Sequence, residues 1–235
     1  MTVDRERVLI TGGGAGIGAA IAQRCAQEGY EPVVIDRDGD GIRADLGDPE
    51  STARALEQAL ADGPITRIVN NVGAVFAASA QEQTLDQFDA AWRLNLAAAV
   101  QCTQALLPGM IEQGFGRIVS VSSRAALGKA DRSAYAATKA GLIGLSRVWA
   151  LELGRHGITA NVVAPGPIAT ELFRRANPAD SPRTQAILRG IPVGRMGEAV
   201  DVAHCAAHFL DRRSGFVTGQ VLYVCGGMTV GVAPV

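Results

Sequence analysis

Hydrophobic positions along the chain follow two patterns that alternate. Short runs of consecutive apolar residues, typical of strands buried on both faces of a sheet, alternate with longer segments in which apolar residues recur every three or four positions. The runs predict strands at residues 7–11, 32–35, 65–70, 117–121, 159–164 and 220–224. The longer segments predict helices at residues 17–28, 49–61, 85–113, 133–155 and 199–210. Such alternation predicts the α/β class, with one doubly wound parallel sheet covered by helices on both faces.

Local chemistry places several helix boundaries. Asp48 followed by Pro49 predicts an N-cap with proline at the first helical position. Thr84 and Gln87 have the spacing of a capping box, which predicts the start of the long helix at 85–113, with a kink expected at Pro108.

Two segments depart from a regular alternation. Only residues 37–41 separate the second strand from the apolar stretch 42–45, whereas a parallel crossover normally takes a dozen residues or more, so the third strand should be vestigial or displaced. A long segment precedes the last helix, and its residues 171–190 are predicted to form a substrate lid. Without repeats or linkers, residues 1–235 are expected to form a single domain.

Composition and charge narrow the classes of partner. The 22 basic and 23 acidic residues nearly cancel, so no broad field is available to recruit nucleic acid or an anionic membrane. No uninterrupted apolar run approaches the roughly 20 residues that span a bilayer, and no apolar leader precedes the first strand. We therefore expect a cytoplasmic protein whose partners are small molecules or copies of itself.

Cysteine and histidine spacing does not indicate a metal site. The four cysteines are isolated, with neither a CxxC pair nor a histidine at ligand spacing. His204 and His208 share a helical face, but without a third ligand in view their packing on an amphipathic helix is the favoured interpretation.

A glycine-rich turn, TGGGAGIG at residues 11–18, joins the first strand to the first helix. Free N–H groups and the positive dipole end of a helix attract anions, and glycine lets the backbone approach a pyrophosphate closely. Strand, turn and helix together predict the dinucleotide site of a Rossmann-type fold. The residues expected to contact the cofactor in this turn are Gly12, Gly14, Ala15, Gly16, Ile17 and Gly18.

The end of the second strand carries opposing signals about the cofactor. Asp36 lies about 20 residues beyond the glycines, where a carboxylate can accept hydrogen bonds from both ribose hydroxyls of NAD and would repel a 2′-phosphate. Arg37 could instead pair with that phosphate. NAD is favoured over NADP, and both remain open.

Further motifs follow in a fixed order, and with them the chain resembles the short-chain dehydrogenase/reductase (SDR) family over essentially its whole length. The motifs are the glycine turn, Asp45-Leu46, Asn70-Asn71-Val72-Gly73, Asn95, Ser123, Tyr135-Ala136-Ala137-Thr138-Lys139, Pro165-Gly166 and Gly226-Gly227. Val72 stands where the family often has alanine, and Cys225 stands where aspartate is common.

The chemistry of the central pair can be argued from its spacing. Tyr135 and Lys139 are four residues apart on a predicted helix, so their side chains share one face. We expect the ammonium to lower the pKa of the phenol by about 1 to 3 units, which would let Tyr135 act as general acid and base at a substrate oxygen.

The resemblance implies roles for the remaining residues. Lys139 would also bind the nicotinamide ribose, Ser123 would hydrogen-bond the substrate oxygen, with Ser122 as an alternative, and Asn95 would hold a water behind the lysine. Asp45 and Leu46 would meet the adenine. The loop of Asn71, Val72 and Gly73 would line the adenosine, and Pro165, Gly166, Ile168 and Thr170 would grip the nicotinamide, unless Thr170 only caps a helix.

The expected function is an NAD-dependent oxidoreductase that moves a hydride between the cofactor and a secondary alcohol or ketone, using Asn95, Ser123, Tyr135 and Lys139. The alternatives are an NADPH-dependent 3-oxoacyl-thioester reductase and a regulator that binds a dinucleotide without turnover. The lid arginines Arg174, Arg175, Arg183 and Arg189 suit an acidic substrate, although a solvated basic loop is the more common outcome. Phe173, Ile187 and Leu188 would equally suit an apolar ring or an acyl chain. The resemblance also implies a homotetramer built largely from the two long helices.

Overall fold

The sheet of this protein, seen in a computed structural model that describes residues 6–231 without the side chains of residues 172 and 176, is parallel throughout. Seven strands formed by the described residues lie in the order β3-β2-β1-β4-β5-β6-β7, and each neighbouring pair is parallel. They are β1 (Arg7–Thr11), β2 (Glu31–Asp36), β3 (Ile42–Arg43), β4 (Arg67–Asn70), β5 (Gly116–Val121), β6 (Ile158–Pro165) and β7 (Val221–Val224). The predicted α/β class with a doubly wound sheet is confirmed.

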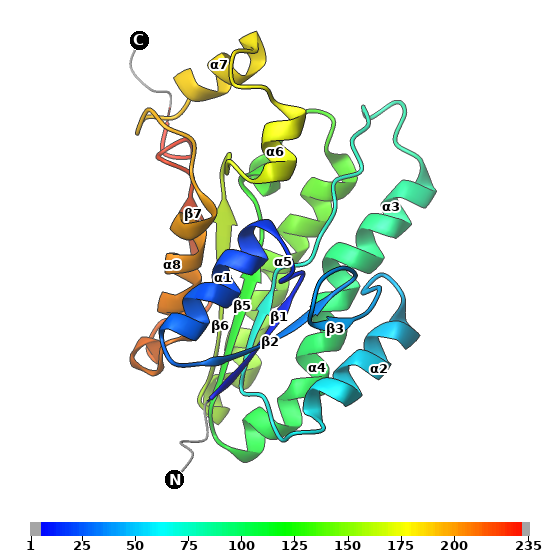
Figure 1. Cartoon of the computed structure of the whole chain (residues 1–235), viewed down its shortest axis with the longest axis vertical. Helices are drawn as coiled ribbons and strands as arrows, with labels where there is room; N and C mark the ends of the chain where they lie inside the picture. The colour runs from blue at the N-terminus through cyan, green and yellow to red at the C-terminus, as the bar shows by residue number, and fades with distance from the viewer. Residues whose placement is uncertain (1–5, 232–235) are drawn as a thin grey trace.

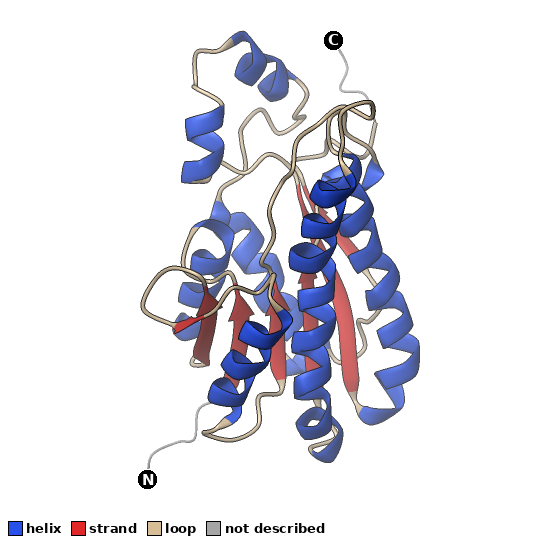
Figure 2. Ribbon diagram, turned by 90° about the vertical axis from the view of Figure 1, so that its right-hand side faces the viewer, coloured by secondary structure: helices blue, strands red, loops and turns tan. Residues whose placement is uncertain are grey.

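Helices cover both faces of the sheet (Figures 1 and 2). Helices α1 (Gly16–Gln27) and α8 (Ala199–Leu210) pack on one face, and α2 (Pro49–Leu60), α4 (Ala98–Glu112) and α5 (Ser133–Leu153) pack on the other. Val8 packs in the core beneath α1 and α8, whereas the next residue, Leu9, packs in the core beneath α2 and α4, because successive side chains of a strand point to opposite faces. The 3-10 segments are η2 (Arg124–Leu127), η3 (Gly154–His156) and η4 (Arg212–Ser214).

The predicted helix at 85–113 is one continuous helical segment that contains a π-helical turn. Helix α3 (Leu85–Trp92) starts at the predicted capping box of Thr84 and Gln87, and the π-helical segment η1 (Arg93–Ala97) joins it to α4. The sequence pattern did not predict the π turn. The helical segment from Leu85 to Glu112 is long and apolar enough to span a membrane on those two criteria alone, which buried core helices also meet.

The connection between β2 and β3 has no helix. Residues 37–41 form a loop, and the two residues of β3 pair in parallel with Ile35 and Asp36. The loop folds against β2 so closely that a Cβ on Gly41 would lie 2.5 Å from the carbonyl oxygen of Val34. The third strand is therefore vestigial, as predicted, but it keeps its place beside β2 and is not displaced.

The predicted lid contains two short helices. Helices α6 (Glu171–Ala176) and α7 (Pro182–Arg189) lie beyond the carboxyl ends of the strands (Figure 1). Thr170 caps α6 by accepting a hydrogen bond from the amide of Phe173, and Ser181 caps α7 in the same way from Thr184. This segment lies over the edge of the sheet where parallel α/β folds place their ligands.

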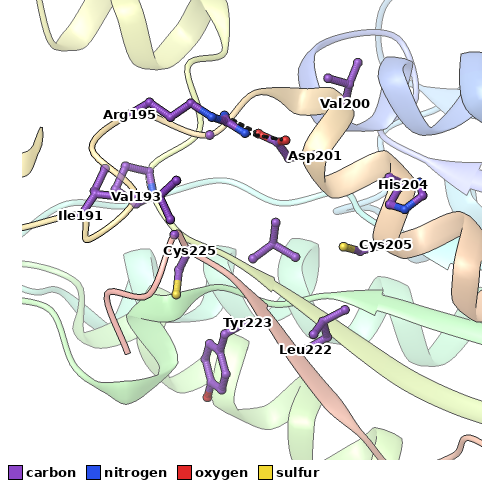
Figure 3. A pocket seen from close by; sticks show the side chains of 14 residues that line it. Ile191, Val193, Arg195, Val200, Asp201, His204, Cys205, Leu222, Tyr223 and Cys225 are labelled. Atoms are coloured by element: carbon purple, nitrogen blue, oxygen red, sulfur yellow. Dashed lines mark hydrogen bonds and ion pairs between the residues drawn. The ribbon is translucent and has the colours of Figure 1, made fainter. Parts of the chain in front are cut away.

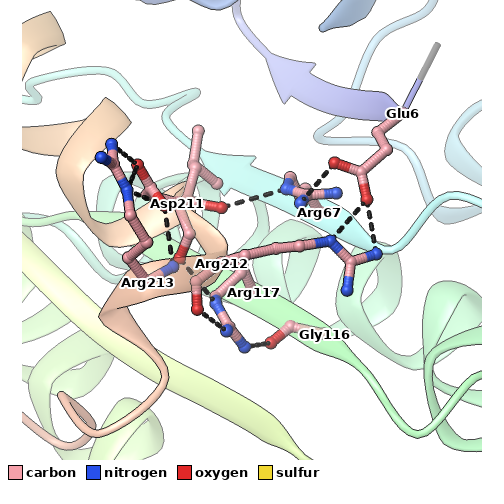
Figure 4. Close-up of polar contacts among 8 residues, drawn as sticks. Glu6, Arg67, Gly116, Arg117, Asp211, Arg212 and Arg213 are labelled. Atoms are coloured by element: carbon pink, nitrogen blue, oxygen red, sulfur yellow. Dashed lines mark hydrogen bonds and ion pairs between the residues drawn. The ribbon is translucent and has the colours of Figure 1, made fainter.

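At the amino ends of the strands, opposite the lid, buried arginines form a network of polar contacts that the sequence pattern did not predict (Figure 4). Arg67 is fully buried, donates to Glu6 and to the carbonyl of Leu210, and stacks between the rings of Tyr30 and Phe115. Arg212 binds the same Glu6 carboxylate at 2.6 Å. This network joins the start of β1 to the end of α8, far from the lid.

Candidate active site

The glycine turn leaves the first amides of α1 open to an anion. Ala15 at the N-cap provides no side-chain cap, and residues 14–16 are exposed. Gly12 and Gly16 have φ angles of +66° and +56°, which favour glycine. A Cβ on Gly18 would lie 2.0 Å from the carbonyl oxygen of Gly12, so no other residue fits there. An uncapped helix start with a bare glycine backbone before it fits the pyrophosphate of a dinucleotide.

Asp36 fixes the shape of this turn. Its Oδ2 accepts a hydrogen bond from the amide of Gly14 at 2.8 Å, and its Oδ1 accepts one from the amide of Asp38 at 3.3 Å. Arg37 is exposed and its Nε lies 3.6 Å from a carboxylate oxygen of Asp38. The carboxylate thus lies at the glycine turn, whereas the guanidinium is at the surface beside it.

The loop after β4 is tied to the same turn. Thr11 Oγ1 accepts hydrogen bonds from the amides of Asn71 and Val72, and the Asn71 amide group donates to the carbonyls of Thr11 and Gly12 at 2.9 Å each. Val72 packs partly against the core. Thr11 was not predicted as a site residue, although its position directly before the glycines could have drawn attention to it.

Asp45 and Leu46 divide into an exposed and a buried residue. Leu46 belongs to the core, while the exposed Asp45 carboxylate accepts a hydrogen bond from the amide of Gly47 at 2.9 Å. The pair lies after β3 and before α2, on the side of the sheet that carries Asp36. This position is compatible with the adenine contact that the resemblance implies.

Gly73 lies against two of the predicted catalytic side chains. A Cβ on Gly73 would lie 3.0 Å from Asn95 Oδ1 and 3.1 Å from Lys139 Nζ, so a side chain there would crowd both. The glycine turn adjoins the same loop, since a Cβ on Gly12 would lie 3.0 Å from Cα of Val72. The structure therefore brings the glycine turn, loop 71–73, Asn95 and Lys139 together.

The π segment aims Asn95 at this loop. Asn95 is buried, its Oδ1 accepts a hydrogen bond from the amide of Ala74 at 2.8 Å, and its Nδ2 donates to Ala74 O and to Thr138 Oγ1. Asn95 thereby joins the loop to α5. Thr138, which the sequence reasoning left without a role, is the partner on α5.

The two serines after β5 have different environments. Ser122 is buried and its hydroxyl donates to the carbonyl of Lys139 at 2.7 Å. Ser123 is half-buried, caps η2 by accepting a hydrogen bond from the amide of Ala125, and lies close enough to the phenol of Tyr135 for its hydroxyl to lower the pKa of that phenol. Ser123 is thus the serine that contacts Tyr135, whereas Ser122 holds α5 on β5.

Lys139 is buried beneath the Tyr135 ring. Its Nζ donates to the carbonyl of Val121 at 2.8 Å and lies 5.7 Å from the ring centroid. Burial lowers the pKa of Lys139 to about 8. An ammonium has three N–H groups, so two remain beyond the bond to Val121, next to the open backbone of Gly73.

The pKa of Tyr135 departs from the sequence-based expectation. Burial raises the pKa of the phenol, and the nearby Ser123 hydroxyl and the charge of Arg132 only partly oppose that effect. The expected lowering by Lys139 is wrong for this structure because the Lys139 ammonium bonds to the backbone of Val121 and loss of solvent dominates. Tyr135 is consequently a neutral phenol at neutral pH.

The segment after β6 runs back toward the glycine turn. Pro165 ends β6, the amide of Gly166 donates to Val224 O, and Ile168 is buried. A Cβ on Gly16 would lie 3.5 Å from Cγ2 of Thr170, so Thr170 lies directly above the turn while its hydroxyl caps α6. Both interpretations of Thr170, helix cap and cofactor neighbour, are compatible with this position.

A separate cavity of about 430 Å³ lies between α8 and β7 at the free edge of the sheet (Figure 3). Cys225 and Cys205 line it, together with His204. Hydrogen bonds from Thr229 and from the amides of Gly227 and Met228 outweigh burial and lower the pKa of Cys225. Within residues 6–231, no group of three or more His, Cys, Asp and Glu side chains is arranged to hold a metal ion.

Comparisons with known proteins agree with this geometry. Residues 12–229 match the family model described as Enoyl-(Acyl carrier protein) reductase. The chain is 37% identical to the (2S)-[(R)-hydroxy(phenyl)methyl]succinyl-CoA dehydrogenase subunit BbsD of Thauera aromatica, covering 98% of this chain and 99% of that one. It is 36% identical to the 3-oxoacyl-[acyl-carrier-protein] reductase MabA of Mycobacterium avium, covering 95% and 90%.

A solved structure extends the likeness to the fold. The protein from Beutenbergia cavernae described as an NAD(P) dependent gluconate 5-dehydrogenase, with bound NADP, superposes with a TM-score of 0.91 at 31% identity over 98% of both chains. Together with the ordered motifs, these matches show that the chain belongs to the short-chain dehydrogenase/reductase family of oxidoreductases.

Proposed function

We propose that this oxidoreductase transfers a hydride between a nicotinamide dinucleotide and the carbon of a secondary alcohol or ketone, with Tyr135 exchanging the proton at the substrate oxygen. The observation that supports this most directly is the convergence of Tyr135, Ser123 and Lys139 at the carboxyl edge of the sheet. The glycine turn reaches the same place through loop 71–73. A bound nicotinamide would supply or accept the hydride there.

Tyr135 is suited to donate a proton in the direction of carbonyl reduction. Because burial raises the pKa of its phenol, the hydroxyl stays protonated at neutral pH and can donate to the oxygen that gains negative charge as hydride arrives. The Ser123 hydroxyl lies beside the phenol of Tyr135, and its O–H can turn to donate to the same substrate oxygen.

Lys139 and Asn95 prepare the place of the cofactor ribose. The two N–H groups of Lys139 not used by Val121 can donate to ribose hydroxyls. Asn95 hydrogen-bonds both the amide and the carbonyl of Ala74, which fixes the preceding residue, Gly73, beside the Lys139 ammonium. Truncating Asn95 would remove its hydrogen bonds to both backbone groups of Ala74, and we expect it to loosen the loop and weaken cofactor binding.

For the cofactor, Asp36 supports NAD(H). Its carboxylate lies at the glycine turn, where it can accept from ribose hydroxyls and would repel a 2′-phosphate. NADP(H) is at least as well supported, because Arg37 is exposed at the same corner and the solved relative from Beutenbergia cavernae carries NADP.

A 3-oxoacyl-thioester reductase is the second candidate activity, since the named relatives from Thauera and Mycobacterium act on thioesters. The test is a panel of ketones, sugar acids and 3-oxoacyl thioesters, each assayed by nicotinamide absorbance with NADH and with NADPH. Turnover of at least one class supports an oxidoreductase and selects the cofactor. Dinucleotide binding without any turnover would instead support a regulator.

The chain also offers a surface for self-association. Exposed apolar side chains lie on α3 and on the outer part of α5, where Leu85 and Leu151 are each 86% exposed and Trp92 is 52% exposed. Leu85 lies near the start of α5 and Leu151 near its end, so these side chains are spread along the two helices, and exposed apolar residues of this kind are common in protein–protein interfaces. We propose a homotetramer assembled through these helices, which size-exclusion chromatography with light scattering would test.

A further inference from the structure

A basic cluster lies beside the candidate active site. The segment between Ser123 and Tyr135 contributes Arg124, Lys129 and Arg132, and α7 of the lid contributes Arg183. We call these four side chains the basic rim. Next to it lies a cavity of about 360 Å³, lined by Ala77, Ala78, Ser79, Glu82, Asp131, Arg132 and Arg183.

Backbone contacts fix the rim close to the proton donor. Arg132 is the N-cap of α5, and Tyr135 lies in the first turn of that helix. Residues 78 and 132 form a parallel bridge, which joins the cavity wall to the start of α5. Asp131 has φ of +59°, an unusual conformation for a residue other than glycine, and its carbonyl accepts a hydrogen bond from Arg132 Nη1 at 2.7 Å.

The positive charges of the rim lie near one another. Partial burial, followed by the charges of Arg132, Arg124 and Arg183, lowers the pKa of Lys129. The charge of Arg132 also reaches the phenol of Tyr135. An anion placed here would therefore relieve repulsion among like charges as well as gain hydrogen bonds.

The rim residues do not pair directly with the two carboxylates that lie nearby. Asp131 and Glu82 line the same cavity, and the Glu82 carboxylate accepts a hydrogen bond from Ser79 at 2.9 Å. Among the side chains described in residues 6–231, none of the four rim residues forms an ion pair, whereas surface arginines such as Arg24, Arg93 and Arg195 do.

We propose that the basic rim binds an anionic group of the substrate, so that the preferred ketone or alcohol carries a carboxylate or a phosphate at the end that faces Arg132 and Arg183. The proposal rests on the oxidoreductase function proposed for Tyr135. Guanidinium groups bind carboxylate and phosphate oxygens in the same two-point manner, so the rim recognises the shared chemistry. The source is either a carboxylate on the substrate itself or the phosphates of a thioester carrier.

Four compounds that share one 3-oxobutanoyl group separate these sources. They are acetoacetate, acetoacetyl-CoA, the neutral thioester S-acetoacetyl-N-acetylcysteamine and neutral ethyl acetoacetate. If the rim binds the substrate anion, the KM of acetoacetate should be about tenfold lower than that of ethyl acetoacetate, or the KM of acetoacetyl-CoA about tenfold lower than that of S-acetoacetyl-N-acetylcysteamine. A low KM for acetoacetate identifies the carboxylate, and one for acetoacetyl-CoA identifies the phosphates. Added salt should raise only the KM of the anionic compounds.

Variants of the rim test the residues. Lys129→Gln and Arg183→Gln should each raise the KM of the preferred anionic compound by about threefold to tenfold and leave the kinetics of ethyl acetoacetate unchanged. Arg155→Gln is the matched control, since Arg155 is exposed and lies beyond the far end of the 21-residue helix α5, about 30 Å from the rim. It should change neither KM.

Titration calorimetry with succinate and with coenzyme A measures anion binding at the rim independently of turnover. The proposal is supported if wild type binds either probe and if Lys129→Gln or Arg183→Gln weakens this binding while Arg155→Gln does not. Equal kinetics for charged and neutral ketones, with no binding of either probe that these variants weaken, would overturn the basic rim and leave the oxidoreductase function standing. Probe binding without turnover of any ketone would overturn that function and with it the assignment of the anion to the substrate.

Discussion

Lys139 Nζ lies 5.7 Å from the centroid of the Tyr135 ring, and its hydrogen bond goes to the carbonyl of Val121. The pair shares one helical face, as the four-residue spacing requires, yet the ammonium is anchored to β5. The lysine therefore fixes the helix to the sheet and offers its remaining N–H groups to the cofactor, while Tyr135 keeps its proton.

Burial of Lys139 should appear in the pH dependence of stability. Its pKa is about 8 in the folded protein and near 10.5 in the unfolded chain, so between these values the unfolded chain binds the proton that the folded protein has released. The cost of burying the charge is thus fully present below pH 8 and is relieved as pH rises toward 10.5. Urea unfolding at about pH 7 and about pH 10 should show wild type gaining stability relative to Lys139→Met. A difference that does not change with pH would contradict the buried ammonium.

Ser122 and Ser123 should separate stability from turnover. Ser122→Ala removes a buried hydrogen bond to Lys139 O, which should cost about 1–2 kcal/mol of unfolding free energy. Ser123→Ala should lower kcat about 10²-fold with a smaller loss of stability, because it removes a donor to the substrate oxygen. Denaturant titration and steady-state kinetics on both variants check this. Loss of turnover in Ser122→Ala alone would reverse the assignment.

Asp36 should decide the cofactor. Asp36→Asn keeps an oxygen that can accept from the Gly14 amide but removes the negative charge, so the preference for NADP(H) over NAD(H), measured as kcat/KM, should rise about tenfold. Asp40→Asn removes an exposed charge from the same loop and serves as the control. If Asp36→Asn leaves the preference unchanged, the carboxylate does not select the cofactor.

The Glu6–Arg67 contact should make stability fall in acid. Burial works to raise the pKa of Glu6, but the hydrogen bond with Arg212 and the charge of Arg67 outweigh it and lower the pKa below 4.5. The stabilisation is present above pH 4.5 and is lost as pH falls through the lower value of the folded protein. Glu6→Gln should cost about 1–2 kcal/mol at neutral pH, a reduced figure because the Glu6 side chain is 37% exposed, and the difference from wild type should shrink in acid. Thermal unfolding over a pH series measures it, and a constant difference would count against the ion pair.

Features set by local chemistry could be predicted from the sequence. The capping box of Thr84 and Gln87 and the Asp48 cap involve neighbours within a few residues, and both form as predicted. The glycine turn could be recognised because strand, turn and helix are contiguous. The α/β class with one parallel sheet followed from the alternation of strands with helices.

Features set by distant packing could not be predicted. The π turn at residues 93–97 directs Asn95 toward Ala74 and Thr138, which belong to other parts of the chain. The spacing of apolar residues along the helix therefore does not indicate this turn. The resemblance favoured Ser123 over Ser122, but the hydrogen bond of Ser122 to the carbonyl of Lys139 could not be predicted until the position of α5 was known. The pKa of Tyr135 was predicted in the wrong direction because its burial and the bond from Lys139 to Val121 both depend on the packing of α5 against β5.

The central claim is that Tyr135 delivers the proton while a nicotinamide delivers the hydride, and the transfer of deuterium from labelled cofactor tests it most directly. With NADH or NADPH deuterated at the transferable position and a ketone found by the substrate panel, wild type should place deuterium on the carbinol carbon. Tyr135→Phe should bind the cofactor as well as wild type, yet form the labelled alcohol about 10²–10⁴-fold more slowly. Labelled product formed at the wild-type rate by Tyr135→Phe, or alcohol formed without deuterium, would contradict the account.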